Sequence, residues 1–169
     1  MTETNLILGV TGLPPQSARN CVQELSPIAN GEFTNTLDGK SIFVETCKRR
    51  RYKSLISCND ANSPLANGIW IGSQILVGCI QNLWQSIEPG ETTINLIRPA
   101  VAGSIYAVNN FADTIKFKEI DNSVQLYRKY DERVFICFRP WLTMHVINFA
   151  LKTDEWGEHS GWQLMLEEV

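Results

Sequence analysis

The pattern that decides the fold lies in residues 141–151, which read Trp-Leu-Thr-Met-His-Val-Ile-Asn-Phe-Ala-Leu. Strict alternation of side chains across two faces is the signature of a β-strand. One face carries Trp141, Thr143, His145, Ile147, Phe149 and Leu151, and the other carries Leu142, Met144, Val146 and Ala150. The sequence therefore predicts a long strand with apolar residues on both faces.

Further strand signals surround this one. Residues 134–138 are continuously apolar, and Pro140 ends that run because proline cannot donate to a sheet ladder. A last strand follows a polar hairpin loop at 154–161, with Trp162, Leu164 and Leu166 on one face. A strand at about 74–81 is also apolar on both faces, which is typical of a central strand or of one covered by another element or subunit.

The first half of the chain carries a hairpin signal and a basic strand. Asp38-Gly39 lies between two β-prone runs at 33–37 and 40–45, and Asp-Gly in that setting predicts a β-hairpin. A strand before it is expected at about 18–25. Residues 49–58 alternate, so that Arg49, Arg51 and Lys53 share one face and Tyr52, Ser54, Ile56 and Cys58 share the other.

These signals predict an all-β, mainly antiparallel fold, either a β-sandwich or a partly open β-barrel, with at most one short helix. The 169 residues fit a single β-rich domain at 1–169. Within it we expect an extended N-terminal lead-in at 1–16, rich in turn residues, and an irregular insertion at 98–123. The pattern leaves residues 113–120 open between a helical turn and a strand.

Composition and charge narrow the classes of partner. Hydrophobic residues make up 44 % of the chain and charged residues 20 %, as in globular proteins. Because no run approaches the roughly 18 apolar residues that span a bilayer, and the start lacks the basic residues of a signal peptide, we expect a cytosol-like compartment and no membrane partner.

The net charge of −3 hides an asymmetry. Five basic residues fall within positions 48–53, whereas the residues after Lys152 include five acidic and no basic side chains. A whole-domain basic excess is the usual footprint of nucleic-acid binding. Its absence argues against that function, and DNA contact is not expected.

Candidate metal and catalytic groups are few. The five cysteines form no CxxC pair, and with His145 and His159 they offer no zinc spacing, so we expect reduced core thiols and no metal or cofactor. The densest titratable set is Asp154, Glu155, Glu158 and His159, which is typical of a solvated hairpin loop.

No sequence motif for catalysis is present. The chain lacks the patterns GxGxxG, GxxxxGK[ST], GxSxG and HExxH. Asp60 and Glu119 are candidates for a pair of catalytic carboxylates, but nothing in the sequence places them together. We therefore expect no enzyme activity and no small-molecule substrate, with a β-fold cell-wall hydrolase as a minor alternative that requires two converging carboxylates.

Three stretches together resemble the minor tail and tail-tip (baseplate) structural proteins of long-tailed bacteriophages. They are Thr11-Gly-Leu-Pro-Pro-Gln-Ser-Ala-Arg19, Tyr52-Lys-Ser-Leu-Ile-Ser-Cys58 through Gly68-Ile-Trp-Ile-Gly72, and Phe138-Arg-Pro-Trp-Leu-Thr-Met144 through Trp156-Gly157 and Gly161-Trp162 to Glu167-Glu-Val169. A glycine often follows the Ser-Ala-Arg phrase, and here Asn20 takes its place. Asparagine tolerates positive φ better than most residues, so we expect a bend there to survive.

The resemblance implies a non-enzymatic structural subunit of a tail tip or baseplate. Such a protein is assembled in the host cytoplasm and ends in the virion tail, as a ring or adaptor in contact with copies of itself and with other tail proteins. Our candidate intersubunit contacts are Arg49, Arg51, Lys53, Trp70, Trp141, Glu167 and Glu168. We expect the basic residues to face an acidic neighbour, such as the Glu167-Glu168 end of an adjacent subunit.

The five tryptophans and the basic strand leave one alternative open. Tryptophan is enriched at interfaces and in stacking platforms for sugars and bases. The alternative is a carbohydrate- or nucleic-acid-binding β-barrel or sandwich module. What distinguishes the binding module from the tail subunit is whether the basic face is open to solvent or covered by a partner.

Overall fold

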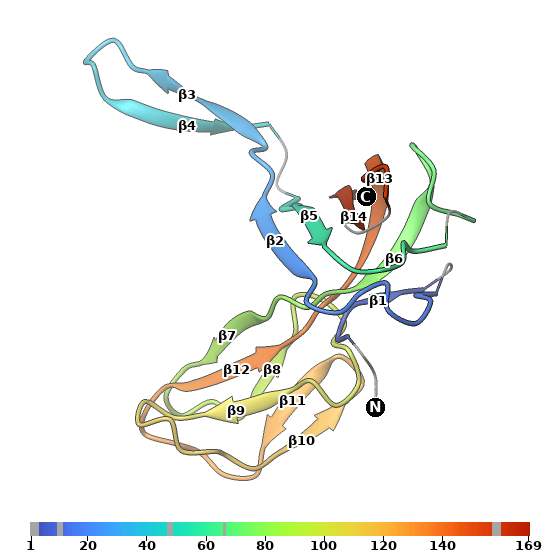
Figure 1. Ribbon diagram of the computed structural model, residues 1–169. Coiled ribbons are helices and arrows are strands. Elements are labelled where there is room, and N and C mark those ends of the chain that lie inside the picture. The colour runs from blue at the N-terminus through green and yellow to red at the C-terminus, as the bar shows by residue number, and fades with distance from the viewer. Residues whose placement is uncertain (1–3, 10–11, 47–48, 66, 157–159) are drawn as a thin grey trace.

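The computed structural model describes residues 4–9, 12–46, 49–65, 67–156 and 160–169. Every regular element in those ranges is a β-strand, and all pairs are antiparallel. The all-β prediction is confirmed. Figure 1 shows three parts: an upper sheet, a small lobe below it and a hairpin that projects from one corner.

The largest sheet, called here the barrel sheet, has six strands and curls into a half-barrel. In spatial order they are β1 (Ile7–Leu8), β6 (Gln74–Gly78), β13 (Trp141–Thr153), β14 (Ser160–Glu168), β5 (Tyr52–Cys58) and β2 (Val22–Pro27). Its concave face holds one hydrophobic core, in which Ile56, Val77, Met144 and Leu164 are fully buried. Loop residues such as Ile69 close that core from outside the sheet.

A β-bulge in the long strand β13 reverses which side chains point toward the core. The pairing with β14 shifts between Val146 and Asn148, so that Phe149 lies opposite the buried Leu164. Opposite residues of an antiparallel pair project to the same face, and Phe149 packs on the concave core. The predicted single alternation from 141 to 151 is therefore wrong beyond Ile147, because the extra residue of a bulge reverses the faces.

The small lobe encloses a second hydrophobic core between two three-stranded sheets. One sheet contains β7 (Leu83–Ile87), β12 (Val134–Phe138) and β9 (Tyr106–Val108), and the other contains β10 (Phe117–Ile120), β11 (Ser123–Leu126) and β8 (Thr93–Asn95). The range 98–123, predicted as an irregular insertion, carries β9 and β10. It also supplies the buried Val101, Ala107 and Ile115, and Ala107 and Ile115 belong to this core.

The chain joins the two parts at Pro140 and at a buried glutamine. β12 ends at Phe138 and β13 begins at Trp141 in the other sheet, as the proline predicted. The carbonyl of the Gln23 side chain accepts hydrogen bonds from the backbone N–H groups of Ile80 and Gln81, at 2.7 and 3.1 Å. Its amide donates to Ser54 Oγ at 2.9 Å. Gln23 therefore ties the barrel sheet to the segment that enters the small lobe.

The N-terminal region is less extended than predicted. Within the expected lead-in at 1–16, β1 pairs with β6 and places Leu6 and Leu8 in the barrel core. At the position where the resemblance suggested a bend, Asn20 has a φ of 58°. Asparagine adopts this left-handed conformation more readily than most residues, and the bend directs the chain into β2.

Candidate assembly surface

The most exposed element is the hairpin of β3 (Gly31–Asn35) and β4 (Ser41–Glu45). We call residues 31–45 the arm. It forms a two-stranded sheet of its own, and Figure 1 shows it extending away from both lobes. The predicted Asp38-Gly39 turn is in place: Gly39 has a φ of 76°, and Thr36 closes the loop through hydrogen bonds with Lys40 and Gly39.

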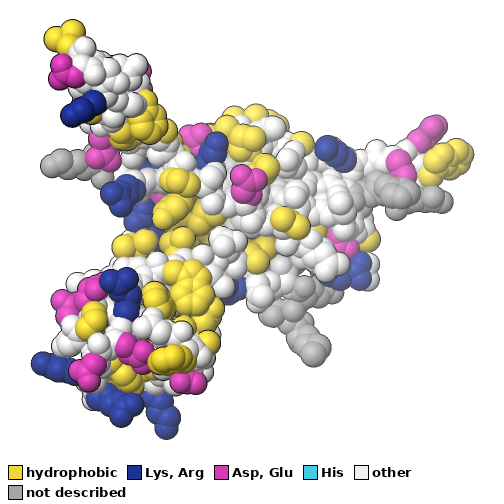
Figure 2. Space-filling model, turned by 90° about the vertical axis from the view of Figure 1, so that its left-hand side faces the viewer, with side chains coloured by type: hydrophobic (Ala, Val, Ile, Leu, Met, Phe, Trp, Pro, Cys, Tyr) yellow, Lys and Arg dark blue, Asp and Glu magenta, His cyan; other side chains and the backbone are white. Residues whose placement is uncertain are grey.

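Both faces of the arm present apolar side chains to solvent. Phe33 lies opposite Phe43, and their ring centroids are 5.0 Å apart. The other face carries Ile42 and Val44, and the exposed fractions of these four side chains run from 43 % to 78 %. Figure 2 shows hydrophobic side chains on the projecting arm. An isolated hairpin is marginally stable in water, so the arm lacks the apolar burial that stabilises the rest of the chain.

The close approach of the two strands at the base of the arm requires a glycine. A Cβ atom at Gly31 would lie 2.0 Å from the backbone oxygen of Val44. Beside it lies a hollow of about 440 Å³, called here the root hollow. Its lining includes Asn30, Glu32, Thr46 and Arg51. The base of the arm is thus a polar depression, whereas its length is apolar.

The basic residues that precede β5 are held through their backbone. The carbonyls of Arg49, Arg50 and Arg51 accept hydrogen bonds from Asn30 Nδ2, Arg98 Nη2 and the N–H of Ile28, respectively. These three arginines are called the root segment. Since strand pairing begins only at Tyr52, the predicted strand from Arg49 starts late. The side chains of Arg49 and Arg50 are exposed, and that of Arg51 is half-buried in the root hollow. Lys48 lies outside the described residues.

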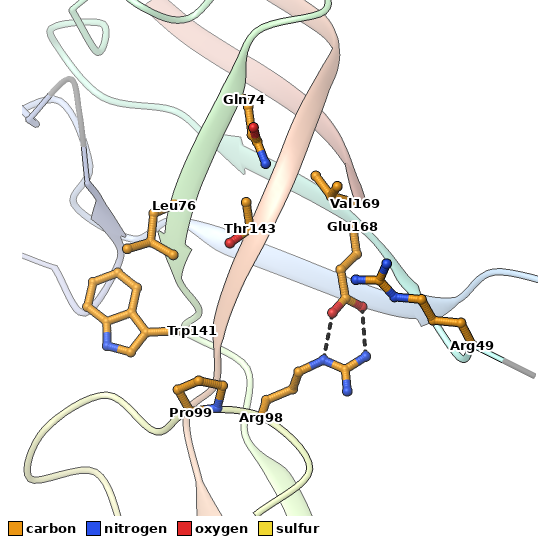
Figure 3. A pocket seen from close by; sticks show the side chains of 9 residues that line it. All are labelled: Arg49, Gln74, Leu76, Arg98, Pro99, Trp141, Thr143, Glu168 and Val169. Atoms are coloured by element: carbon orange, nitrogen blue, oxygen red, sulfur yellow. Dashed lines mark hydrogen bonds and ion pairs between the residues drawn. The ribbon is translucent and has the colours of Figure 1, made fainter. Parts of the chain in front are cut away.

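Glu168 is engaged within the chain. Its Oε1 accepts a 2.6 Å hydrogen bond from Arg98 Nε, and its Oε2 accepts bonds from Arg98 Nη2 at 3.1 Å and from the N–H of Tyr52 at 3.0 Å. The carboxylate is buried, and it raises the pKa of Arg98. Arg98 also lies 5.9 Å from the centre of the Tyr52 ring. This clamp joins the small lobe, the last strand and the root segment, as Figure 3 shows.

The clamp forms one wall of a hollow of about 380 Å³. Trp141, Leu76 and Pro99 line its apolar side, and Arg49 points toward it from the root segment (Figure 3). Trp141 is half-buried, and its ring approaches to 3.1 Å of where a Cβ at Gly78 would lie. Trp141 thus packs on its own sheet and leaves one edge on this hollow.

Lys53 and Glu167 are direct cross-strand neighbours on the convex face of the barrel sheet. Glu167 also lies opposite His145 on its other side. All three side chains are exposed. Unlike charges at opposite positions attract one another. Lys53 and Glu167 are thus neighbours within one chain, and the expected contact of the basic residues with an adjacent subunit stays a prediction.

Trp70 lies in a hydrogen-bonded turn before β6. Trp70 is 77 % exposed and Ile71 is 66 % exposed. The preceding residue, Ile69, is buried in the core of the barrel sheet. The hydroxyl of Ser73 donates to the carbonyl of Trp70 at 2.6 Å, and the N–H of Gly72 donates to the carbonyl of Val146 at 2.8 Å. The hydrogen bonds define the backbone of the turn, which presents an exposed aromatic side chain at the surface.

The titratable side chains in the part of the chain that the structure describes form no metal-binding cluster. No three His, Cys, Asp or Glu side chains among those residues are placed to hold a metal ion. Asp60 pairs with Arg19 at 2.7 Å. Hydrogen bonds from Arg19 lower the pKa of Asp60 to about 2. Glu158 and His159 of the polar loop lie outside the described residues.

The arm is the feature that sequence reasoning undervalued. Its hairpin was predicted, but its isolation was not, because nothing local tells whether another strand pairs with β3 or β4. The sequence signal for an apolar surface on the arm was the run of Ile42, Phe43 and Val44, which places apolar side chains on both faces of the hairpin. A two-sided apolar strand next to a tight turn needs a covering element.

No protein-family model matches the chain, and no curated protein is similar enough in sequence to count as a relative. Among the described residues, no helix is long and apolar enough to cross a lipid bilayer.

Proposed function

We propose that this protein is a non-enzymatic structural subunit of a bacteriophage tail tip or baseplate, assembling as a ring or adaptor with copies of itself and with neighbouring tail proteins. The sequence resemblance supplies the setting. The observation that carries the proposal is the arm, an ordered hairpin with apolar side chains on both faces and no core of its own.

Burial of the arm against a partner is energetically favourable. Complete burial of one Phe, Ile or Val side chain contributes about 1.5–3 kcal/mol, and four such side chains are at least 43 % exposed. Two apolar faces let the arm lie between two surfaces at once. That arrangement suits a subunit whose neighbours surround it, as in a ring.

The exposed arginines of the root segment would orient a partner that binds the arm. Arg49 and Arg50 are exposed where the arm meets the body, and Figure 2 shows Lys and Arg side chains near that junction. Charges at the rim of an interface chiefly steer encounter and fix register. An acidic patch on the neighbouring subunit or tail protein is the complementary partner. Trp70 and the hollow beside Trp141 are further candidate contacts.

The first experiment measures the native mass of the purified full chain over a range of concentrations. We expect a closed oligomer of defined stoichiometry. Replacing Phe33 and Phe43 together by serine is expected to return the protein to a monomer with an unchanged melting temperature. A matched control replaces the exposed Phe111 and Tyr127 of the small lobe, which are 79 % and 72 % exposed, and leaves assembly intact.

Proteomic analysis of purified phage particles that encode this chain tests the setting separately. The protein is expected in the tail fraction at a stoichiometry above one copy. Its absence from intact particles would overturn the tail assignment, whatever its oligomeric state. Assembly that survives both charge reversal of Arg49 and Arg51 at low salt and loss of the two phenylalanines would refute the arm as the contact.

One observation favours the alternative of a carbohydrate-binding module. Trp84 and Tyr106 project from β7 and β9, with ring centroids 5.6 Å apart and exposed fractions of 53 % and 40 %. Exposed aromatic rings stack on sugar faces through their large apolar surfaces. Tryptophan fluorescence that responds to soluble oligosaccharides, with the response abolished in Trp84→Ala, would favour this function over the tail subunit.

A further inference from the structure

Two thiols meet where the β2–β5 ladder ends. The register pairs Val22 with Ser57, so the next step pairs Cys21 with Cys58. The N–H of Ile28 donates to the carbonyl of Arg51, which makes that pair hydrogen-bonded. Because hydrogen-bonded and non-hydrogen-bonded pairs alternate along an antiparallel ladder, Cys21 and Cys58 occupy a non-hydrogen-bonded pair.

This kind of pair has the spacing that a disulfide needs. Directly opposite residues at such positions have Cα atoms about 4.5 Å apart, with their side chains on the same face. A disulfide spans Cα separations of about 4.4–6.8 Å. Burial and the neighbouring Cys58 side chain raise the pKa of Cys21, and both residues are free thiols in this structure. The register therefore places the two thiols side by side on one face of the ladder.

The surroundings hold the two strands in this register. One step beyond the thiols, Arg19 and Asp60 form a 2.7 Å ion pair, and the N–H of Arg19 donates to Asp60 Oδ2 at 2.8 Å. The Cys58 thiol also donates to the carbonyl of Arg19. Contacts between the two chain segments thus continue on the far side of the thiols.

We propose that Cys21 and Cys58 are a site of reversible oxidation, at which an intramolecular disulfide ties the edge strand β2 to β5. The disulfide closes the end of the β2–β5 ladder that lies away from the arm, since the chain enters β2 at Cys21 and leaves it toward the arm after Pro27. The proposal does not depend on the function of the assembled protein.

The oxidant is a low-molecular-weight disulfide, such as oxidised glutathione. The thiolate of the half-buried Cys21 attacks one sulfur of the reagent and releases one glutathione thiolate. The thiolate of Cys58 then attacks Cys21 Sγ in the mixed disulfide and releases the second. Two protons leave the protein, and two electrons reduce the reagent to two glutathione molecules.

Burial raises the pKa of both thiols, so the thiolate is scarce near neutral pH. Since the thiolate is the nucleophile, the reaction is slow at pH 7 and accelerates about tenfold per pH unit toward pH 9. A reducing compartment keeps the pair as thiols, and an oxidising one converts it to the disulfide.

The test incubates the wild-type chain with oxidised glutathione, blocks the remaining thiols with an alkylating reagent, and maps the peptides by mass spectrometry. We expect a peptide pair joined through Cys21 and Cys58, and a rise in melting temperature on the order of 5–10 °C over the reduced protein. Cys79→Ser, which removes another buried thiol, should form the same link. Cys21→Ser should abolish both the link and the rise.

The wild-type map keeps the proposal falsifiable if a variant fails to fold. Recovery of Cys21 and Cys58 as alkylated thiols after prolonged incubation at pH 9 would overturn it. A stable glutathione adduct at Cys21 without the intramolecular link would overturn it as well.

Discussion

The arm and the β13–β14 pair are both antiparallel hairpins, yet only one of them has a hydrophobic core. In β13–β14, every second side chain of β14 from Trp162 to Leu166 is buried, and the pair lies at the centre of a six-stranded sheet. In the arm, Phe33 and Phe43 pack on each other and remain exposed to solvent. The two elements share hydrogen bonding but differ in burial.

This difference separates what a hairpin contributes to folding from what it contributes to assembly. Backbone hydrogen bonds replace bonds to water, and each contributes only about 1 kcal/mol net. Apolar burial supplies the larger part of the free energy of folding. The β13–β14 pair therefore stabilises the monomer, whereas the apolar side chains of the arm stay exposed and contribute little to that stability.

The sharpest test substitutes the same residue type in the arm and in a buried strand, for which β12 offers Phe138. Phe138→Ala removes a fully buried side chain and should lower the free energy of unfolding by about 3–5 kcal/mol. Phe33→Ala, at a side chain that is 78 % exposed, should change it by less than about 0.5 kcal/mol. Urea denaturation followed by circular dichroism checks both. Similar losses in the two variants would mean that the arm has a core in the monomer.

The clamp between the lobes should contribute less than the core and more than a surface pair. Arg98→Ala leaves the buried Glu168 carboxylate with the Tyr52 N–H as its remaining described partner, and should cost about 2 kcal/mol. The matched control is Arg133→Ala. It breaks an ion pair with Glu88 in which both side chains are about half exposed, at 51 % and 53 %, and should cost less than about 0.5 kcal/mol. Equal effects on thermal unfolding would contradict this assignment.

The Arg19–Asp60 pair at the start of β2 predicts a pH dependence. The pKa of Asp60 falls from 3.8 to about 2 in the folded protein, so its contribution is present above pH 4 and is lost as the pH falls toward 2. That contribution is about 1–2 kcal/mol, because Arg19 is partly exposed to solvent. Asp60→Asn should flatten the curve of melting temperature against pH in this window. A wild-type curve and a variant curve that run parallel below pH 4 would argue against the pair.

The smallest effect is expected at the bend before β2. Asn20 has a positive φ, at 58°, so Asn20→Gly should leave the melting temperature nearly unchanged, whereas Asn20→Ala should cost about 1 kcal/mol through backbone strain. Differential scanning calorimetry of the two variants measures this. Equal stability of the alanine and glycine variants would show that the bend is not maintained in solution.

Much of the fold was predictable from local pattern. The strand at 134–138, its end before Pro140 and the Asp38-Gly39 turn follow from period-two alternation and turn chemistry, and the structure confirms them. The bulge at Ile147 was not predictable, because one inserted residue preserves the apolar character of both faces. The strands β9 and β10 within 98–123 were not predicted, because strands of three and four residues have too few alternating positions to give a pattern.

The sequence indicated which charged and aromatic residues were candidates for the site, but not which of them pair with one another. Glu168 and Arg98 are 70 positions apart, and no local rule brings them together. The same holds for Lys53 and Glu167, whose register depends on β5 pairing with β14 rather than with a neighbour in sequence. Long-range strand pairing therefore determines which charged side chains have a partner within the chain.

Amide hydrogen exchange of the full chain, at concentrations below and above assembly, tests the central claim most directly. We expect residues 31–45 to exchange rapidly in the dilute monomer, to become protected on assembly, and to differ throughout from residues 141–153, which stay protected in both states. Protection of the arm equal to that of β13 in the monomer, or no change in the arm on assembly, would contradict the account.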